Sequence, residues 1–427
     1  METPFLTKSR CLHASATTRI LLAMLLVLSQ LGRGSALDIP RRAGARPGQG
    51  RPKGRPYNTR VVKPDASLLK ARWRVLGARP LGLYYHFADA RALKSLEVHA
   101  SQITLLGPQS FWVDADGIVH GQVPPRVMEI ARRAKLPVMP LLINPHFDRP
   151  TASALLRHPH AQERAAVYLA YLARRDNYVG WQLDLENIDP ADQQRYTQFV
   201  ARVAARLHRE NRLLSVAVVP RFSDAPPSAS PSGEFRTGEQ GAPYDFRALS
   251  RVVDFMALMT YNHHGNDTPP GPVAGYNWVK AALDYAVQRV PRAKLLLGIP
   301  FYGREWVSTS QGTSSRTLAF QDVKGMLDRP EIKARWDERS RTGWFEYRDD
   351  SGLHTAWYED SKSLNEKLQL MQEYQLRGFA AWRLGVEDAK FWSLAVLTRK
   401  SASPASARRG RKLESLAAPA PPRSRSR

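Results

Sequence analysis

The sequence predicts an α/β fold: a TIM (β/α)8 barrel with a small α+β insertion between its seventh and eighth strands. Three observations support this. Eight short apolar runs recur along the chain, amphipathic segments of helical length separate most of them, and the last two runs lie much farther apart than one helix requires. Alternating strands and helices favour a parallel sheet, and eight such units are typical of a closed barrel.

The composition excludes several other classes of protein. Hydrophobic residues make up 43% of the 427 residues and charged residues 24%, as in ordinary globular proteins. The single cysteine, Cys11, excludes a disulfide framework, a cysteine-based zinc site and an iron–sulfur cluster. The sequence contains no P-loop, dinucleotide fingerprint or Gly-x-Ser-x-Gly elbow. We expect no cofactor and no metal site.

Residues 1–36 are typical of a secretory signal peptide. Basic residues precede an apolar run from Ile20 to Leu28, and small residues follow at positions 34–36. The run is too short to span a bilayer comfortably, although an uncleaved anchor is the alternative. We therefore expect export to the periplasm, the cell envelope or the extracellular space.

Most of the positive charge lies at the two ends of the chain. Of the net charge of +24, residues 1–36 contribute +3, residues 37–63 contribute +7 and residues 399–427 contribute +8. The composition predicts a basic Pro/Gly/Arg-rich linker over residues 37–72 and a basic disordered tail over 399–427. These segments either attach the protein to an anionic wall or membrane surface or are simply solvated. We expect no specific nucleic-acid partner and a monomeric protein.

The barrel is expected to occupy residues 73–398. The predicted strands are Leu81–Phe87, Ile103–Trp112, Val138–Ile143, Val179–Leu185, Leu214–Val219, Phe255–Met259, Leu295–Ile299 and Gly378–Trp382. Amphipathic segments predict helices over residues 162–174, 193–210 and 278–289. Short aromatic and charged stretches from about 304 to 358 indicate the inserted subdomain.

The fourth predicted strand carries the most informative polar residues. Gln182, Asp184 and Glu186 alternate with apolar residues, so strand geometry points all three toward the barrel interior. Reactive groups in TIM barrels gather where the strands end. Mutual repulsion between two carboxyls this close is expected to raise one pKa, which suits a proton donor. The alternative is a pair of carboxylates that bind backbone amides or an arginine.

Together with three other segments, this strand resembles glycoside hydrolase family 18, the chitinase-like family. The family signature Asp-Gly-x-Asp-x-Asp-x-Glu is similar to the segment from Val179 to Glu186, in which the Gly, the last Asp and the Glu match. Gln182 stands where the family has an acidic residue. After strand six, Met259-Thr-Tyr-Asn262 resembles Met-x-Tyr-Asp, with Asn262 in place of the Asp.

Two later segments complete the resemblance. Leu297 to Arg304 is similar to the strand-seven segment of the family, and Gly378 to Gly385 resembles the strand-eight segment. The order and spacing of the four motifs cover residues 75–397. The likeness is closer to the bacterial cell-wall and spore-cortex-lytic branch than to insect or plant chitinases.

The resemblance implies a substrate-assisted retaining hydrolase of β-1,4-linked N-acetylglucosamine polymers, either peptidoglycan or chitin. Glu186 would protonate the glycosidic oxygen, Asp184 would orient the 2-acetamido group, and Tyr261 would donate a hydrogen bond to it. Trp382 would stack beneath the sugar, or alternatively plug the barrel core. The substrate-binding positions that the resemblance implies are Gln182, Met259, Asn262, Tyr302 and Trp382.

Two other functions remain open at this point. Gln182 and Asn262 depart from the family pattern, which favours a catalytically impaired, lectin-type glycan-binding protein. A basic protein whose tails carry the function is the second alternative. His263 and His264 lack a third spaced ligand, so we expect a rim or substrate contact rather than a metal site. Asn266-Asp-Thr268 fits the N-glycosylation pattern.

Overall fold

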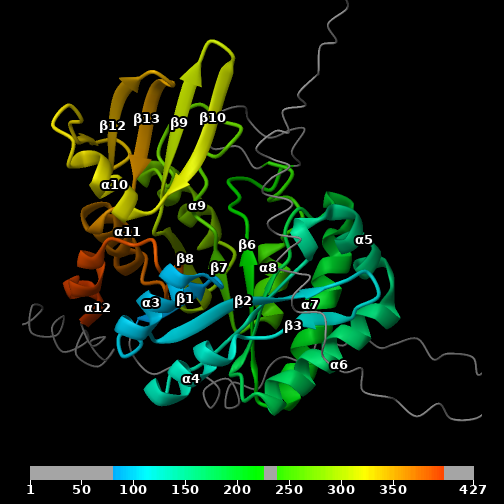
Figure 1. Ribbon diagram of the computed structural model, residues 1–427. Helices are drawn as coiled ribbons and strands as arrows, with labels where there is room; N and C mark the ends of the chain where they lie inside the picture. The colour runs from blue at the N-terminus through cyan, green and yellow to red at the C-terminus, as the bar shows by residue number, and fades with distance from the viewer. Residues whose placement is uncertain (1–79, 226–237, 399–427) are drawn as a thin grey trace, which may run out of the picture. The chain divides into compact units, whose positions relative to one another are not determined.

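The computed structural model describes residues 80–225 and 238–398 of the chain (Figure 1). The predicted signal peptide, linker and tail, at residues 1–36, 37–72 and 399–427, lie outside the described residues. Within the described ranges, no helix is long and apolar enough to cross a membrane.

Eight parallel strands form a closed barrel. Their order is β1-β14-β8-β7-β6-β5-β4-β2, and the pairing of β1 with β2 closes the sheet. The strands are β1 Leu81–His86, β2 Leu105–Val113, β4 Leu141–Ile143, β5 Gly180–Asp184, β6 Leu213–Val218, β7 Phe255–Leu258, β8 Leu295–Pro300 and β14 Gly378–Trp382. The predicted TIM barrel and its eight strands are therefore confirmed. A further short strand, β3 (Val119–Gly121), runs antiparallel to the end of β2.

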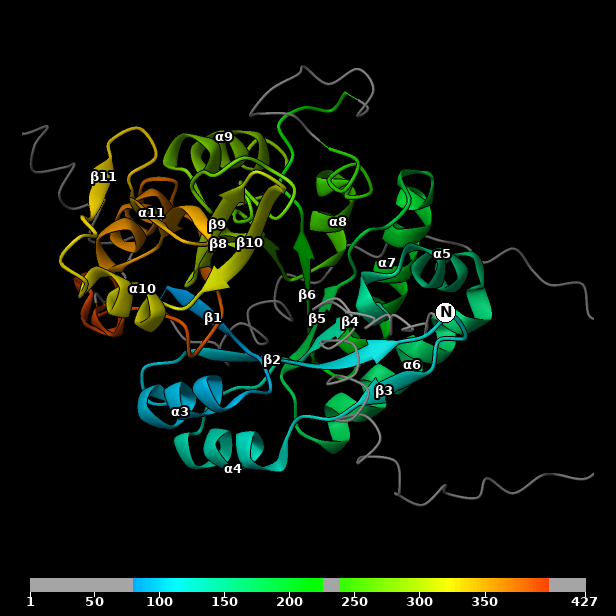
Figure 2. The same cartoon turned by 45° about the horizontal axis from the view of Figure 1, so that its top comes forward.

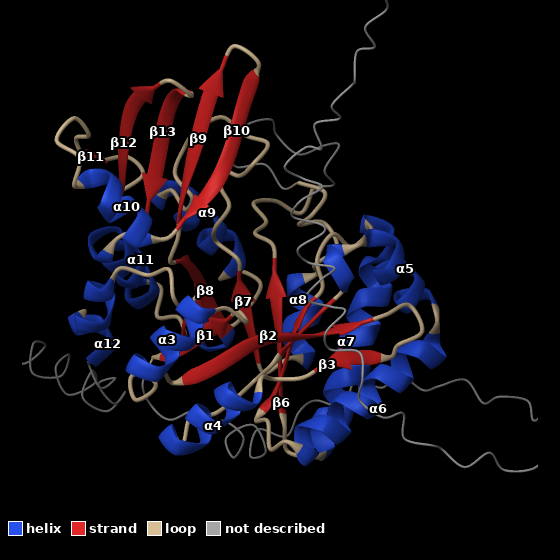
Figure 3. Cartoon of the chain, in the orientation of Figure 1, coloured by secondary structure: helices blue, strands red, loops and turns tan. Residues whose placement is uncertain are grey.

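Helices surround the strands (Figure 3). The α-helices of the barrel are α3 Ala90–His99, α4 Pro125–Ala134, α5 Arg149–Arg157, α6 Pro159–Arg175, α7 Gln193–Arg209, α8 Phe246–Val252, α9 Tyr276–Ala286, α11 Ser361–Glu373 and α12 Ala395–Thr398. Short 3-10 turns are η2 Pro145–Phe147, η3 Pro190–Asp192, η5 Arg292–Lys294 and η6 Ala389–Ser393. Aspartates cap several of the helices. Asp89, for example, accepts a 2.8 Å hydrogen bond from the amide of Ala92 at the start of α3, a contact worth about 1 kcal/mol.

Alternate residues of each strand enter two separate hydrophobic cores. In β5 and just beyond it, Trp181, Leu183 and Leu185 belong to the large core between sheet and helices. The interior of the barrel holds a smaller core, to which β1 contributes Leu81 and Leu83. Since strand side chains alternate between faces, this packing turns the residues between the apolar ones of β5 toward the barrel axis.

A second sheet interrupts the barrel between β8 and β14. It consists of β9 Gly303–Thr309, β10 Gly312–Leu318, β11 Arg335–Asp337, β12 Thr342–Asp349 and β13 Gly352–Tyr358, with helix α10 Phe320–Leu327. These strands are antiparallel in the order β10-β9-β13-β12-β11, and Phe345 lies in their own small core. Figures 1 and 2 show that this sheet begins where β8 ends.

Candidate active site

A cleft of about 1380 Å³ opens at the carboxyl ends of the barrel strands. Its volume exceeds the roughly 300–1,000 Å³ of small-molecule pockets, which suits a long substrate. The residues that line it come from the ends of most barrel strands and from β9. They include Phe87, Gln109, Phe147, Arg149, Asp184, Glu186, Asn187, Phe222, Met259, Tyr261, Asn262, His263, His264, Asn266, Asp267, Trp278, Arg304 and Trp382.

Asp184 and Glu186 reach this cleft from the end of β5. Asp184 is buried, and its Oδ1 has no hydrogen-bond partner among the described residues. Glu186 is partly exposed and faces the same cleft. An unsatisfied buried carboxylate oxygen is costly unless a ligand completes its hydrogen bonding. This pair is therefore suited to receive a polar group of a bound substrate.

Burial raises the pKa of both carboxyls. The pKa of Glu186 is raised to about 7 by removal from water. Burial also raises the pKa of Asp184 well above its usual range, and the neighbouring Glu186 charge adds to the shift. We expected repulsion to be the main cause and one group to be affected. The structure instead makes desolvation the main cause for both.

Two side chains from distant segments fix the end of β5. Asn144, which is buried after β4, donates from Nδ2 to the Glu186 carbonyl at 3.0 Å and accepts from the Glu186 amide at 3.0 Å. Tyr244 donates its hydroxyl to the carbonyl of Leu185 at 2.8 Å. Beyond Glu186 the chain turns sharply, because Asn187 adopts a positive φ of 52°. The backbone that carries Glu186 is thus held on both sides.

Tyr261 enters the cleft from the segment after β7. Its position depends on Gly298, where a Cβ atom would lie 2.3 Å from the carbonyl oxygen of Leu258. This close approach lets Thr260 donate its hydroxyl to the Gly298 carbonyl at 2.7 Å. Burial raises the pKa of Tyr261 well above its usual range, and the neighbouring Tyr85 and Asp184 add to the rise. Tyr261 therefore remains a neutral phenol that can donate a hydrogen bond.

Trp382 is the last residue of β14. The sequence left open whether its ring stacks beneath a sugar or fills the barrel core, and its position suits both. Its ring lines the cleft and is partly exposed. The same ring packs on the interior core and lies 5.4 Å from the ring of Tyr85 at an angle of 54°. The tryptophan therefore closes the barrel and presents an aromatic surface to the cleft.

Gln182 and Tyr302, which the resemblance implies as substrate-binding residues, are buried and do not line the cleft. Gln182 is fully buried below Asp184 and donates from Nε2 to the hydroxyl of Ser215 at 3.0 Å. Tyr302 is 5% exposed and donates its hydroxyl to Oδ1 of Asn262 at 2.5 Å. Asn262 itself lines the cleft with a positive φ of 59°. Tyr302 thus contacts a residue that faces the cleft, whereas Ser215, the partner of Gln182, is itself buried.

The histidine pair forms part of the cleft wall. The His263 ring stacks on Trp278 at 4.7 Å and 13°, and burial beside His264 lowers the pKa of His263 to about 3. His264 contacts the carbonyl of Pro269 at 2.9 Å through Nδ1. Across residues 80–225 and 238–398, no three His, Cys, Asp or Glu side chains are grouped to hold a metal. The neutral, stacked His263 therefore belongs to an aromatic surface.

The sequence of this chain is similar to those of known glycosyl hydrolases. The family model "Glycosyl hydrolases family 18" matches residues 144–387. An uncharacterized glycosylase, YvbX, from Bacillus subtilis is 26% identical over 72% of this chain and 88% of its own length. A cortical fragment-lytic enzyme of the same organism is 27% identical over 68% of this chain and 67% of its own.

Solved structures agree with these sequence relatives. A chitinase from Chromobacterium violaceum superimposes with a TM-score of 0.68 and 26% identity, covering 76% of this chain and 99% of the chitinase chain. The spore cortex-lytic enzyme SleL of Bacillus megaterium gives a TM-score of 0.67 with 24% identity, covering 76% of each chain. The second likeness concerns the fold alone.

Proposed function

The chain belongs to family 18 of the glycosyl hydrolases and is a glycosidase, and from this premise we propose that it cleaves polymers containing β-1,4-linked N-acetylglucosamine. The observation that carries the proposal is that Asp184, Glu186 and Tyr261 all line one cleft, in which Trp382 presents an aromatic face. This combination supplies an acid, a hydrogen-bond acceptor, a hydrogen-bond donor and a stacking surface for a sugar that carries an acetamido group.

The proposed reaction retains the anomeric configuration with help from the substrate itself. Glu186 gives its proton to the glycosidic oxygen as that bond breaks. The carbonyl oxygen of the 2-acetamido group attacks the anomeric carbon, which forms an oxazolinium ion. Asp184 accepts the acetamido N–H, and Tyr261 donates to the acetamido oxygen. Glu186, now a carboxylate, removes a proton from the water that opens the oxazolinium ion.

The pKa of Glu186 gives this reaction a defined alkaline limit. The proton donor must be protonated, and a pKa of about 7 keeps it so at mildly acidic and neutral pH. We expect kcat/KM to fall by about tenfold for each pH unit above about 7, as one proton is lost. Initial rates between pH 5 and pH 9 measure this limb. Activity that stays level to pH 9 would show that Glu186 is not the acid.

Reducing-end release from chitin oligomers and from peptidoglycan tests the proposal as a whole. Release from either polymer supports a hydrolase, and the better substrate identifies the polymer class. The lectin-type alternative predicts binding of oligomers in calorimetry with no release from either. Gln182 and Asn262 are the departures that favoured it; Gln182 bonds to Ser215 behind the cleft, whereas Asn262 lines the cleft. The third possibility is a basic protein whose tails carry the function. Removing both basic tails tests it, because hydrolysis by the barrel would survive the removal whereas a function of the tails would be lost.

We also propose that the protein is exported and that its basic ends hold it to an anionic wall or membrane surface. Residues 1–36 support the first statement and the charge of residues 37–63 and 399–427 supports the second. Amino-terminal sequencing of the envelope-associated protein tests cleavage after the small residues at 34–36. Release from envelopes by increasing salt tests the electrostatic attachment.

A further inference from the structure

Helix α6 exposes an apolar stripe on its outer side, where a surface helix usually carries polar residues. Seven large hydrophobic side chains are exposed in the part of the chain that the structure describes, and three of them lie on this helix. Val167, Tyr168 and Tyr171 are between 40% and 47% exposed. Residues three and four apart share one face of a helix, so these side chains form one patch, the α6 stripe. The neighbouring helix α7 exposes mainly polar side chains, those of Gln194, Arg195, Gln198 and Arg209.

The two tyrosine rings of the α6 stripe suit an interface better than a sugar. They stack on each other with 5.8 Å between the ring centroids and 23° between the planes. The guanidinium of Arg175 lies 5.7 Å from the Tyr171 ring. This stacking leaves little free ring face on which a sugar could lie. Tyrosines, which are apolar along the ring and polar at the tip, are favoured at the boundary between water and lipid headgroups.

A basic pocket lies at the end of the same helix. It has a volume of about 860 Å³ and is formed where α4, α6 and α7 end, next to the amino ends of β4, β5 and β6. The described residues that line it include one carboxylate, that of Asp176, and four cations, Arg132, Lys135, Arg175 and Arg212. Arg175 therefore connects the α6 stripe with the basic pocket.

The positive charge of the basic pocket is only partly balanced within the protein. Asp176 accepts from Nε and from Nη2 of Arg175, both at 2.8 Å, which engages the one carboxylate. No carboxylate of the described chain forms an ion pair with Arg132, Lys135 or Arg212. The carboxyl ends of the three helices contribute roughly half a negative charge each. They offset about half of the net charge of +3 that the lining carries, so the pocket attracts an anion.

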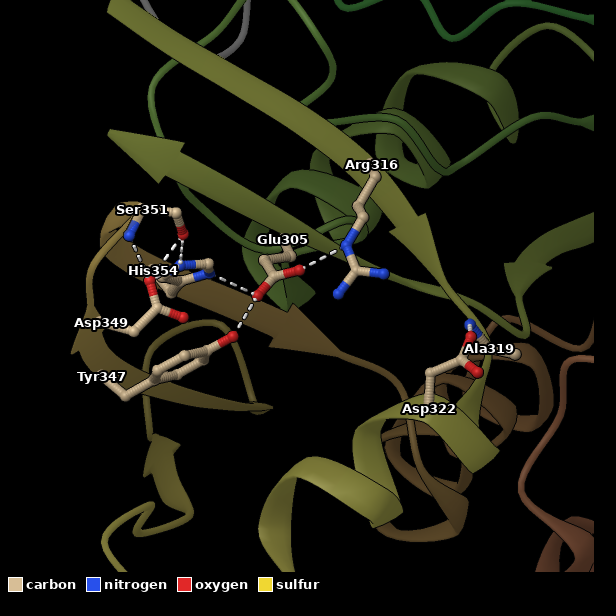
Figure 4. A network of polar contacts seen from close by, with 8 residues as sticks. All are labelled: Glu305, Arg316, Ala319, Asp322, Tyr347, Asp349, Ser351 and His354. Atoms are coloured by element: carbon tan, nitrogen blue, oxygen red, sulfur yellow. Dashed lines mark hydrogen bonds and ion pairs between the residues drawn. The ribbon is translucent and has the colours of Figure 1, made fainter. Parts of the chain in front are cut away.

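A charge that is purely structural has a different environment in this protein. Figure 4 shows Glu305 of the inserted sheet held by Arg316 at 2.6 Å, Tyr347 at 2.8 Å and His354 at 2.8 Å. Both oxygens of that carboxylate are engaged by neighbouring side chains. The exposed cations of the basic pocket have no comparable acidic partners among residues 80–225 and 238–398. Their charge is therefore available to a ligand.

We propose that the α6 stripe and the basic pocket dock the barrel on an anionic phospholipid bilayer. Tyr168 and Tyr171 enter the headgroup region, and Arg132, Lys135 and Arg212 receive a lipid phosphate in the pocket. The charge of the pocket selects anionic over neutral lipid, and the amphipathic rings select a bilayer over a soluble anion. This docking is a property of the folded barrel, beyond the proposed hydrolysis and separate from attachment through the basic ends.

Docking in this way determines which way the active site faces. The basic pocket lies at the amino ends of the barrel strands, whereas the cleft opens at their carboxyl ends. The cleft is therefore turned away from the bilayer and stays open to a polymer. In Figures 1 and 2, α11 lies on the other side of the barrel from α6, so most helices of the barrel do not touch the lipid.

Hydroxyl-radical labelling of the full chain, read residue by residue in a mass spectrometer, tests this docking. Labelling rates are measured without lipid, with vesicles of equal parts phosphatidylglycerol and phosphatidylcholine, and with vesicles of phosphatidylcholine alone. We expect the rates of Tyr168 and Tyr171 to fall by about threefold or more with the anionic vesicles only, because their rings leave water. Phe87, which is 42% exposed in the cleft, should keep its rate. Binding through the basic ends alone would leave both tyrosines labelled as in water.

Two pairs of substitutions test the stripe and the pocket separately. Tyr168→Ser with Tyr171→Ser, and Arg132→Gln with Lys135→Gln, should each raise the dissociation constant for anionic vesicles by about fivefold or more. Sedimentation with the vesicles measures this constant, and thermal melting verifies folding. The matched control, Lys94→Gln with Val98→Ser, removes one exposed cation and one exposed apolar side chain from α3 and should leave the constant unchanged.

Four results would contradict docking on an anionic bilayer. The first is unchanged labelling of Tyr168 and Tyr171 with anionic vesicles, and the second is equal protection by phosphatidylcholine alone. The third is a dissociation constant that neither pair of substitutions changes. The fourth is protection by soluble polyphosphate but not by vesicles, which would assign the basic pocket to an anionic polymer instead.

Discussion

Replacing Glu186 with Gln is expected to lower kcat by about 10³-fold or more on any polymer that the protein cleaves. The amide has nearly the shape of the carboxylic acid but no acidic proton, and general acid catalysis contributes roughly 10²–10⁴-fold. The backbone of residue 186 is held by Asn144 and that of residue 185 by Tyr244 rather than by the side chain. The fold and the binding of oligomers should therefore survive. Initial rates and calorimetry on the same preparation measure both quantities.

Glu346→Gln is the control for this change, because Glu346 is exposed on β12 and accepts a hydrogen bond only within the inserted sheet. Its kcat should equal that of the unmodified protein. If Glu186→Gln retained more than about a tenth of the activity, another group would have to supply the proton. In that case the assignment of Glu186 as the acid would be withdrawn.

Replacing Asp184 with Asn is expected to have the second largest effect, a fall in kcat of about 10²-fold or more. Asp184 has an unsatisfied buried oxygen that faces the pocket shared with Glu186 and Tyr261. The developing oxazolinium cation lowers the raised pKa of Asp184 and favours its carboxylate, whereas an amide carries no negative charge and accepts a weaker hydrogen bond from the acetamido N–H. Because the cation appears only as the glycosidic bond breaks, kcat should fall more than binding does.

The control for this change is Asp284→Asn on α9, where the carboxylate is exposed and pairs with Lys280. Steady-state rates on chitin oligomers and on peptidoglycan strands measure the effect. Near-normal kcat in Asp184→Asn would mean that the acetamido group is not oriented by this residue. The substrate-assisted mechanism would then lose one of the two carboxyl groups on which it depends, Asp184 and Glu186.

Much of the barrel could be predicted because its strands are buried on both faces. Such strands appear as uninterrupted apolar runs, and β1 and β6 are buried along their whole length. The inserted sheet gave a weaker signal. Its edge strand β10 has the sequence GTSSRTL and is mostly exposed. No apolar residues alternate along such a strand, so the pattern that identifies strands is absent.

The acidic pair was predictable for a local reason, since a period of two along one strand places Asp184 and Glu186 on one side. The sequence did not predict how deeply each residue of these motifs is buried. Gln182 and Tyr302 belong to the same motifs as the residues of the cleft, yet other parts of the barrel cover them. That cover is a tertiary property, and it also explains why burial rather than repulsion sets the pKa values of the acidic pair.

Contacts between distant segments could not be predicted from the sequence. Asn144 lies 42 residues from Glu186, and Tyr244 lies 59 residues from Leu185. Neither Asn144 nor Tyr244 belongs to a sequence motif that predicts a hydrogen bond to the end of β5.

The anomeric configuration of the first product tests the central claim most directly. Proton NMR of a chitin oligomer or a peptidoglycan strand, recorded immediately after the protein is added, resolves the two anomers before they interconvert. Attack by the acetamido oxygen followed by attack of water inverts the anomeric carbon twice, so we predict that the β-anomer forms first. Initial formation of the α-anomer would mean direct attack by water and would contradict the substrate-assisted mechanism.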